Sequence, residues 1–339
     1  MNVGIIGLGF MAATHIKAYH QVPDARIGGL CNPSGRHLDG DFTDVAGNVG
    51  RNEPVKLNMQ GVKATRDFAE LLADPEIQII DICAPTKAHV ELSVAALRAG
   101  KHVICEKPLA RTPEAARQIA DAANSVKSFF MPAMCMRFWP EWAWLKTAIE
   151  KQKFGKVLSA SFRRVAEPPA WGQKNFFQGA ESGGGLFDLH IHDVDFVQFC
   201  FGRPRRVYAQ GYKKFSGAID HVVTQYEVES GTIVQAEGSW AFAKGFGFSM
   251  TYCVNFDGAT VDYDLARTPD PLRVVEEGKP PVIVRCEGPD GYVGELTHFI
   301  ECIRAGKPPS IVTVDDAVSS VEICAAEEKS VLSGMPERL

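Results

Sequence analysis

The chain has 339 residues with a formal net charge of -5, and 45% of its residues are hydrophobic. This length and composition predict a soluble protein of two domains, whose core is large enough to need no disulfide or structural metal. The acidic balance argues against nucleic-acid and membrane partners, since both attract basic patches. The sequence contains no apolar run long enough to span a bilayer and no secretory signal pattern at its start.

The nine cysteines are scattered and include no Cys-x-x-Cys pair. Several of them lie within apolar runs, where a reduced thiol behaves as a small hydrophobic group. The odd count and this placement favour the reducing cytoplasm and argue against a disulfide framework or a zinc site. We therefore expect a cytoplasmic protein without a bound metal.

The first motif lies at the start of the chain. A short apolar strand, Val3 to Ile6, runs into the turn Gly7-Leu8-Gly9-Phe10-Met11-Ala12, and a helix follows to Tyr19. In a dinucleotide site the first glycine permits the tight turn, the second lets a pyrophosphate approach the backbone, and the small third residue keeps the helix close to the sheet. The amides at the helix start then face the phosphates. Residues 7–12 are therefore the predicted NAD(P) pyrophosphate site.

The second strand, Arg26 to Cys31, is expected to end beside the adenosine ribose. NAD sites usually have an acidic residue there, but this chain has Asn32. Asn32 is suited to bond a ribose hydroxyl, and Ser34 and Arg36 to hold a 2′-phosphate; the alternative is that Arg36 is simply solvated. The pattern leaves NAD and NADP both open and leans toward NADP. Residues 38–60, rich in Asp, Gly and Asn, predict a long loop.

Two further strands end in polar residues. Ile77 to Cys83 is followed by Pro85, Thr86 and His89 at a helix start, where His89 either approaches the nicotinamide or makes a local hydrogen bond. The apolar run 102–105 ends in Glu106-Lys107-Pro108. The carboxyl ends of parallel strands are where open α/β sheets bind ligands, so Lys107 is a candidate acid/base group. A solvated lysine at a strand end is the alternative.

The alternation of strands and helices predicts the fold class. A helix at 112–124, with Thr112 as its N-cap, and a strand at 129–133 complete a doubly wound parallel sheet. Beyond residue 155, alternating segments joined by Ser230-Gly231 and Asp257-Gly258 predict an antiparallel sheet of about six or seven strands. We expect an N-terminal Rossmann domain, residues 1–125, and a C-terminal α+β domain with a large, mostly antiparallel open sheet, residues 126–339.

A glycine-rich segment precedes the second candidate site. Gly183 to Gly185 lead into an expected helix over 186–201, on which Asp188 and His192 share a face. Such a pair can orient an imidazole for proton transfer, and a capping aspartate with a structural histidine is the alternative. His190 and His192 are two apart and do not face each other on a helix, which argues against a metal site.

The Gly-x-Gly-x-x-Ala turn, Glu106-Lys107-Pro108 and the glycine loop before Asp188 and His192 occur in order. Together they resemble the Gfo/Idh/MocA family, named after glucose–fructose oxidoreductase and inositol dehydrogenase, over nearly the whole chain. The resemblance implies Lys107, Asp188 and His192 as the catalytic group. It also implies cofactor contacts at Pro85, Thr86, His89 and Glu106, and substrate contacts at Arg137 and His190. Trp171, in the loop before the glycines, is suited to line the same pocket, and plain packing is the alternative.

The resemblance implies hydride transfer between NAD or NADP and a secondary alcohol or carbonyl of a sugar, cyclitol or related polyol. It also implies a Rossmann domain and a homo-oligomer, which we expect to be a homodimer or a homotetramer. Asn32, Thr86 and His190 depart from the common family pattern, so the cofactor and pocket remain open. A non-catalytic NAD(P)-binding sensor and an NAD-dependent glycoside hydrolase are the alternative functions.

Overall fold

The computed structural model describes residues 1–45, 54–169 and 176–339, so the candidate Trp171 lies outside the described residues. The contacts divide the chain into two compact units. The first consists of Met1–Phe138 and Pro289–Val318, and the second of Trp139–Gly288 and Ser319–Leu339. The boundary expected after residue 125 falls before the last strand of the first sheet, and residues 289–318 belong to the first unit, not the second.

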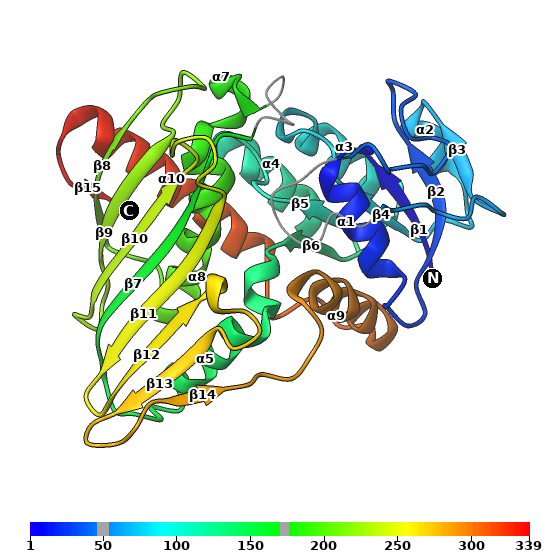
Figure 1. Ribbon diagram of the computed structural model, residues 1–339. Helices are drawn as coiled ribbons and strands as arrows, with labels where there is room; N and C mark the ends of the chain where they lie inside the picture. Colours follow the sequence, from blue (N-terminus) through cyan, green and yellow to red (C-terminus); the bar gives the residue numbers. More distant parts are fainter. Residues whose placement is uncertain (46–53, 170–175) are drawn as a thin grey trace. The chain divides into compact units, whose positions relative to one another are not determined.

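The first unit is built on a six-stranded sheet in the order β3-β2-β1-β4-β5-β6 (Figure 1). All neighbouring strands in it are parallel, which confirms the predicted Rossmann sheet. Its strands are β1 (Asn2–Ile6), β2 (Arg26–Cys31), β3 (Lys63–Thr65), β4 (Ile79–Ile82), β5 (His102–Glu106) and β6 (Phe130–Ala133). The α-helices described within residues 1–138 are α1 (Phe10–Tyr19), α2 (Phe68–Ala73), α3 (His89–Arg98) and α4 (Pro113–Asn124), and two short 3-10 helices lie at Thr86–Ala88 and Cys135–Phe138.

Local sequence explains where several helices begin. The Thr112 side chain accepts a hydrogen bond from the Ala115 amide and Pro113 opens α4, as the sequence predicts. Asp290 caps α9 (Gly291–Ala305) by accepting hydrogen bonds from two amides of its first turn. This helix packs against α1, although Phe10 and Gly291, at which the two helices begin, are 281 positions apart in the sequence. Residues far apart in sequence therefore meet behind the dinucleotide turn.

The second unit contains a nine-stranded sheet in the order β14-β13-β12-β11-β7-β10-β9-β8-β15 (Figure 1). Every neighbouring pair is antiparallel except β7 and β10. The two predicted turns are confirmed, because Ser230-Gly231 joins β9 to β10 and Asp257-Gly258 joins β11 to β12. The strands are β7 (Val157–Ala166), β8 (Arg206–Tyr212), β9 (His221–Glu227), β10 (Ile233–Ser239), β11 (Phe248–Phe256), β12 (Ala259–Asp264), β13 (Leu272–Glu276), β14 (Val282–Val284) and β15 (Glu337–Arg338).

Helices α5 (Pro140–Glu150) and α8 (Ile191–Phe201) cover one face of this sheet. Trp142 of α5 is fully buried and makes edge-on ring contacts with Phe196 of α8 and Tyr252 of β11. The ring centroids are 4.7 Å and 5.1 Å apart, respectively. Buried residues alternate with exposed ones along most of β9 and with partly exposed ones along β12, so the opposite face is open, as predicted. The described residues of the unit also include helix α7 (Gly179–Ser182) and the greater part of α10 (Val314–Ser333).

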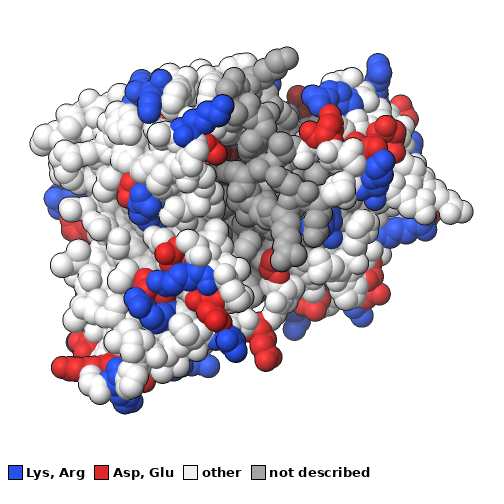
Figure 2. All heavy atoms as spheres, viewed as in Figure 1, with Lys and Arg blue, Asp and Glu red and all other residues white. Residues whose placement is uncertain are grey.

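The described surface mixes charges of both signs. Figure 2 shows Lys and Arg beside Asp and Glu over the visible face. Among the described helices, none is both long enough and apolar enough to cross a membrane.

Candidate functional site

The dinucleotide turn has the geometry that its glycines predict. Gly7 has a φ of +87°, and its amide donates a hydrogen bond to the Cys31 carbonyl at 3.0 Å. A Cβ at Gly7 would lie 2.5 Å from the Ala84 backbone, whereas a Cβ at Gly9 would meet no described atom within 4 Å. The turn is therefore closed on its inner side and open beside the start of α1. Phe10 and Met11 are partly exposed there, and Ala12 is buried.

The turn after β2 is closed by its own side chains. The Asn32 carboxamide oxygen accepts hydrogen bonds from the Ser34 amide at 3.2 Å and the Ser34 hydroxyl at 3.0 Å. The Asn32 amide group donates to the Arg36 carbonyl at 2.8 Å. The Arg36 guanidinium lies 3.4 Å from Asp44, and both side chains are exposed. Asn32 thus shapes the turn, and Arg36 has an acidic partner within the loop.

The segment after β4 lies against the loop that carries Lys107. Pro85 is exposed and Thr86 partly exposed, whereas His89 is 1% exposed. The two ring nitrogens of His89 lie 2.8 Å from the carbonyls of Ala84 and Pro108. Burial lowers the pKa of His89, while these carbonyls favour its protonated form. His89 therefore fastens the end of β4 to the Lys107-Pro108 turn.

Lys107 leaves the sheet immediately after β5. Within residues 103–110 it alone is partly exposed, and every neighbour in that stretch is buried. The Lys107 amide donates a hydrogen bond to the Glu106 carboxylate at 3.1 Å. Buried Glu106 thus fixes the backbone from which the lysine side chain emerges. Its other carboxylate oxygen lies 3.1 Å from Nε2 of His15, which comes from α1.

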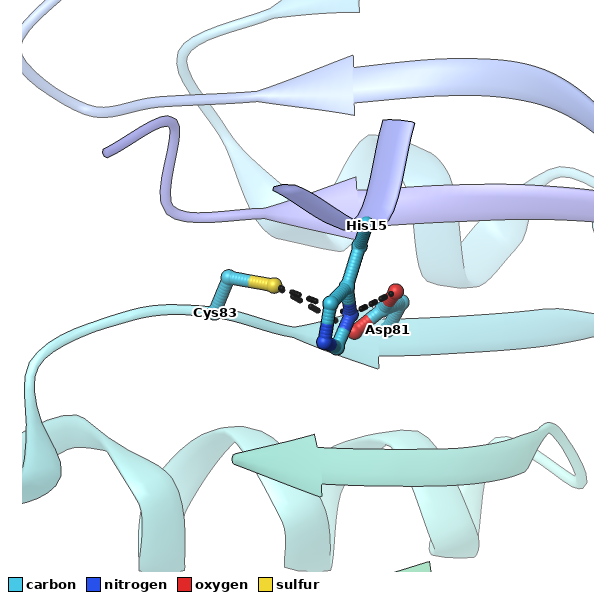
Figure 3. Close-up of side chains that lie close together, drawn as sticks. All are labelled: His15, Asp81 and Cys83. Carbon is cyan, nitrogen blue, oxygen red and sulfur yellow. Dashed lines mark hydrogen bonds and ion pairs between the residues drawn. The ribbon is translucent and has the colours of Figure 1, made fainter. Parts of the chain in front are cut away.

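His15 is the centre of a buried ionic cluster (Figure 3). Its Nδ1 lies 2.8 Å from Asp81 of β4, and the Cys83 sulfur lies 3.6 Å from the same nitrogen. On the other side of the ring, Nε2 also lies 3.8 Å from Glu295 of α9. Burial by itself would lower the pKa of His15, but the charges and hydrogen bonds of Asp81 and Cys83 together outweigh burial and hold that pKa well above its ordinary value. Burial raises the pKa of Glu295, although His15 opposes the shift.

The same cluster brings together a nitrogen, an oxygen and a sulfur that suit a transition metal. His15, however, faces carboxylates through both ring nitrogens, so the imidazolium already supplies the positive charge that a metal would bring. Burial also raises the pKa of the Cys83 thiol, which disfavours the thiolate that metal binding needs. We interpret the cluster as an ion-pair network that joins α1, β4, β5 and α9.

Asp188 and His192 share a distinctive position in the second unit. Within residues 183–198 every residue is buried except these two, which are partly exposed. The expected single helix is in fact a π-helical turn, Leu186–His190, followed by α8. Short π-helical turns are uncommon and frequently occur at functional sites. Both candidate side chains therefore emerge from an otherwise buried helical segment around this irregular turn.

His190 lies inside the second unit. The ring is fully buried, and Nε2 lies 3.1 Å from the Tyr226 hydroxyl and 3.4 Å from Glu327 of α10. Asp193 is also buried and accepts a forked pair of hydrogen bonds from Arg164 of β7 at 2.9 and 3.3 Å. Burial raises the pKa of Asp193 and Arg164 opposes the shift. These contacts fasten the helical segment to the sheet and to α10.

Arg137 was the remaining candidate substrate contact. It is 4% exposed and belongs to the first unit. Its guanidinium donates to the Ile311 carbonyl at 2.7 Å and lies 3.1 Å from Asp316. In this structure Arg137 joins two distant segments of the first unit.

Two models of one protein family match this chain. The oxidoreductase family with an NAD-binding Rossmann fold, GFO_IDH_MocA, matches residues 1–134, and the GFO/IDH/MocA C-terminal domain matches residues 142–261. The chain belongs to the Gfo/Idh/MocA family. The family assignment from the sequence motifs is thereby confirmed.

Individual relatives include dehydrogenases of cyclitols and of an anhydrosugar. Myo-inositol 2-dehydrogenase of Thermotoga maritima is 26% identical, covering 98% of this chain and 96% of the relative. Levoglucosan dehydrogenase of Pseudarthrobacter phenanthrenivorans is 31% identical over 60% of this chain and 51% of the relative. A structure of levoglucosan dehydrogenase in complex with NADH superposes with a TM-score of 0.85 at 23% identity, covering 100% of this chain and 98% of that one. That likeness establishes the common fold.

Sequence reasoning did not identify the ionic cluster around His15. His15 and Asp81 lie in segments recognised as a helix and a strand, but a histidine on a helix and an acid in an apolar strand indicate no partner by themselves. The acid within the buried run 77–83 was the available signal, because a buried carboxylate needs a cation. Its partner, and Glu295 from α9, are defined only by the tertiary fold.

The closed side of the dinucleotide turn yields a first prediction. Gly7→Ala should lower the free energy of unfolding by about 2 kcal/mol or more, because it forces a left-handed conformation and a clash with Ala84. Gly9→Ala is the matched control and should lower the free energy of unfolding by less than about 1 kcal/mol. Urea unfolding of both variants measures the difference. Equal costs at the two positions would contradict the described turn.

The ionic cluster yields a second prediction. His15→Gln should lower the free energy of unfolding at neutral pH by about 3–5 kcal/mol, since it leaves buried Asp81 and Glu106 without their cation. His20→Gln, at the exposed end of the same helix, is the control.

The sign of the pH effect follows from the raised pKa of His15. Above pH 6.5 the unfolded chain has lost this proton and the folded protein still holds it, so stability falls as pH rises toward the folded pKa. The free energy of unfolding of the wild type should therefore fall as the pH rises above 7, with a slope that corresponds to at most one proton, and His15→Gln should lack this contribution. Identical pH slopes in urea unfolding would show that His15 is not held protonated.

Proposed function

We propose that this protein is a dehydrogenase that transfers a hydride between a nicotinamide cofactor and a secondary alcohol or carbonyl of a polyol. Two observations together carry the proposal. The dinucleotide turn is open at Gly9, and two segments that are otherwise buried each have accessible polar residues. Those residues are Lys107 after β5, and Asp188 with His192 around the π-helical turn. Family membership supports the same reaction class.

The cofactor would be held along the carboxyl edge of the first sheet. The open space beside Gly9 and the start of α1 suit a pyrophosphate, and the turn after Asn32 suits the adenosine ribose. Pro85 and Thr86 lie exposed and partly exposed at the end of β4, on the same edge. When bound, the nicotinamide supplies or accepts the hydride. We propose NAD(H) or NADP(H) as this cofactor.

Residues of the protein would transfer the hydroxyl proton of the substrate. His192 takes the hydroxyl proton from the alcohol during oxidation, and Asp188 orients the imidazole and stabilises its charged form. Lys107 places a positive charge beside the oxygen as negative charge develops on it. Glu106 and His89 hold the backbone on either side of Lys107 through the contacts described above. In the reverse direction, His192 returns the proton to the carbonyl oxygen.

Cyclic polyols are the proposed substrates, because the named relatives act on inositols and levoglucosan. The protein would be a cytoplasmic homodimer or homotetramer. Exposed apolar side chains on the open sheet of the second unit, including Ile233 and Val223, support self-association. Incubation with a panel of inositols, aldoses and anhydrosugars and each oxidised cofactor tests the reaction through the absorbance of the reduced nicotinamide.

The outcomes of this panel separate the alternative functions. Reduced cofactor that accumulates with one substrate class supports the dehydrogenase. Cleavage of a glycoside without net cofactor reduction would indicate a glycoside hydrolase that recycles its cofactor. Tight cofactor binding with no turnover on any substrate class would indicate a non-catalytic sensor and contradict the proposal.

The catalytic assignment leads to a third prediction. Lys107→Ala and His192→Ala should each lower turnover by about 10²-fold or more, the scale of lost acid–base catalysis, while cofactor affinity is retained. Steady-state kinetics on a substrate that the wild type oxidises measures this. Asp188→Asn should also slow turnover, since it removes the orienting charge.

His190→Ala is the matched control, because its ring is buried against Tyr226 and Glu327. We expect it to lower stability more than turnover. Near-normal turnover in Lys107→Ala or His192→Ala, or a larger catalytic loss at His190 than at His192, would overturn the assignment.

The cofactor site leads to a fourth prediction. Gly9→Val fills the open space beside α1 and should weaken binding of the reduced cofactor by about tenfold or more. Calorimetric titration measures the affinity. Gly258→Val controls for general effects, because Gly258 is an exposed glycine outside the left-handed region, and the nearest atom to its Cβ position is the Phe154 carbonyl oxygen at 3.4 Å. Unchanged affinity in Gly9→Val would place the pyrophosphate elsewhere.

A further inference from the structure

Arg66 lies at the edge of the first sheet where the adenosine end of the cofactor is proposed to bind. Cys31 at the end of β2 pairs with Thr65 at the end of β3, and the Asn32 amide donates to the Thr65 carbonyl at 3.1 Å. The two chains therefore leave the sheet together. Arg66 is the first residue after β3, directly beside the turn formed by residues 32–36.

The Arg66 guanidinium occupies the space that a side chain at Gly35 would fill. A Cβ built on Gly35 would lie 2.5 Å from Nη2 and 2.8 Å from both Cζ and Nε of Arg66. Gly35 also has a φ of +78°, a conformation that favours glycine. The planar cation thus lies against the backbone of the turn. Arg66 itself is exposed, and the ion pairs formed among the described residues do not include it.

The turn beneath this cation carries no carboxylate. An acidic residue after β2 bonds the ribose hydroxyls of NAD and repels the 2′-phosphate of NADP. Here Asn32 takes that position, and its carboxamide is hydrogen bonded to Ser34 and Arg36. The repulsive charge is therefore missing, and a guanidinium lies beside the same turn. Arg36, by contrast, is paired with Asp44.

We propose that Arg66 binds the 2′-phosphate of NADP(H), so that this enzyme accepts NADP(H) as well as NAD(H). The planar guanidinium can donate two parallel hydrogen bonds to phosphate oxygens. The proposal rests on the proposed function, since it assigns a specificity residue within the same cofactor site. It differs from the expectation at the level of sequence, because Arg66 and not Arg36 is the main phosphate contact.

Calorimetric titration with NADPH, NADH, 2′,5′-ADP and 5′-AMP tests this assignment. The last two probes report only the adenosine end and differ by the 2′-phosphate. Arg66→Gln should lower the affinity for NADPH and 2′,5′-ADP by about tenfold or more. The affinity for NADH and 5′-AMP should stay within about twofold of the wild-type value. Arg66→Lys keeps the charge and loses the planar fork, so its loss should be intermediate.

Arg36→Gln is the matched control and should change the NADPH affinity by less than about threefold. The inference is overturned if Arg66→Gln leaves the NADPH-to-NADH affinity ratio unaltered, if Arg36→Gln causes the larger loss, or if the wild type binds NADH and not NADPH. That last result leaves the proposed function intact. A wild type that binds neither cofactor contradicts the proposed function itself.

Discussion

The protonated ring of His15 is the interaction on which the first unit depends. One buried imidazolium faces Asp81 at 2.8 Å and Glu106 at 3.1 Å, so a single charge joins helix α1 to strands β4 and β5. Both acids would be costly to bury without it. Because Glu106 also accepts the Lys107 amide, the same charge connects the helix of the dinucleotide turn to the backbone that carries the candidate catalytic lysine.

The second unit uses a similar arrangement with different residues. The forked pair between Arg164 and Asp193, and the contacts of His190 with Tyr226 and Glu327, hold one helical segment against the sheet and α10. These buried polar groups have partners on separate elements, which fixes the orientation of the helix. Asp188 and His192 are thereby left as the accessible polar residues of residues 183–198. Buried polar contacts select which side chains face outward in both units.

Much of the candidate site could be recognised before the fold was known. The glycine turn, Glu106-Lys107-Pro108 and the Asp188–His192 spacing are local patterns, and each lies where a strand or helix places it. The roles of residues whose partners lie far away in the sequence were harder to predict from such patterns. The family resemblance implied His190 and Arg137 as substrate contacts, yet each is buried against segments more than 30 residues away. No sequence motif indicates Arg66, because its position beside the turn after β2 depends on the pairing of β2 with β3.

The parallel sheet, the large antiparallel sheet and the family could be predicted from the amino-acid sequence, because hydrophobic periodicity, turn residues and motif spacing are local properties of the chain. The strand order, the parallel pairing of β7 with β10, the nine strands of the second sheet and the return of α9 to the first unit became known from the fold. So did the ionic partners of His15. Such contacts join residues up to 280 positions apart, as Glu295 and His15 are. They follow from the packing of several elements at once, which no local pattern encodes.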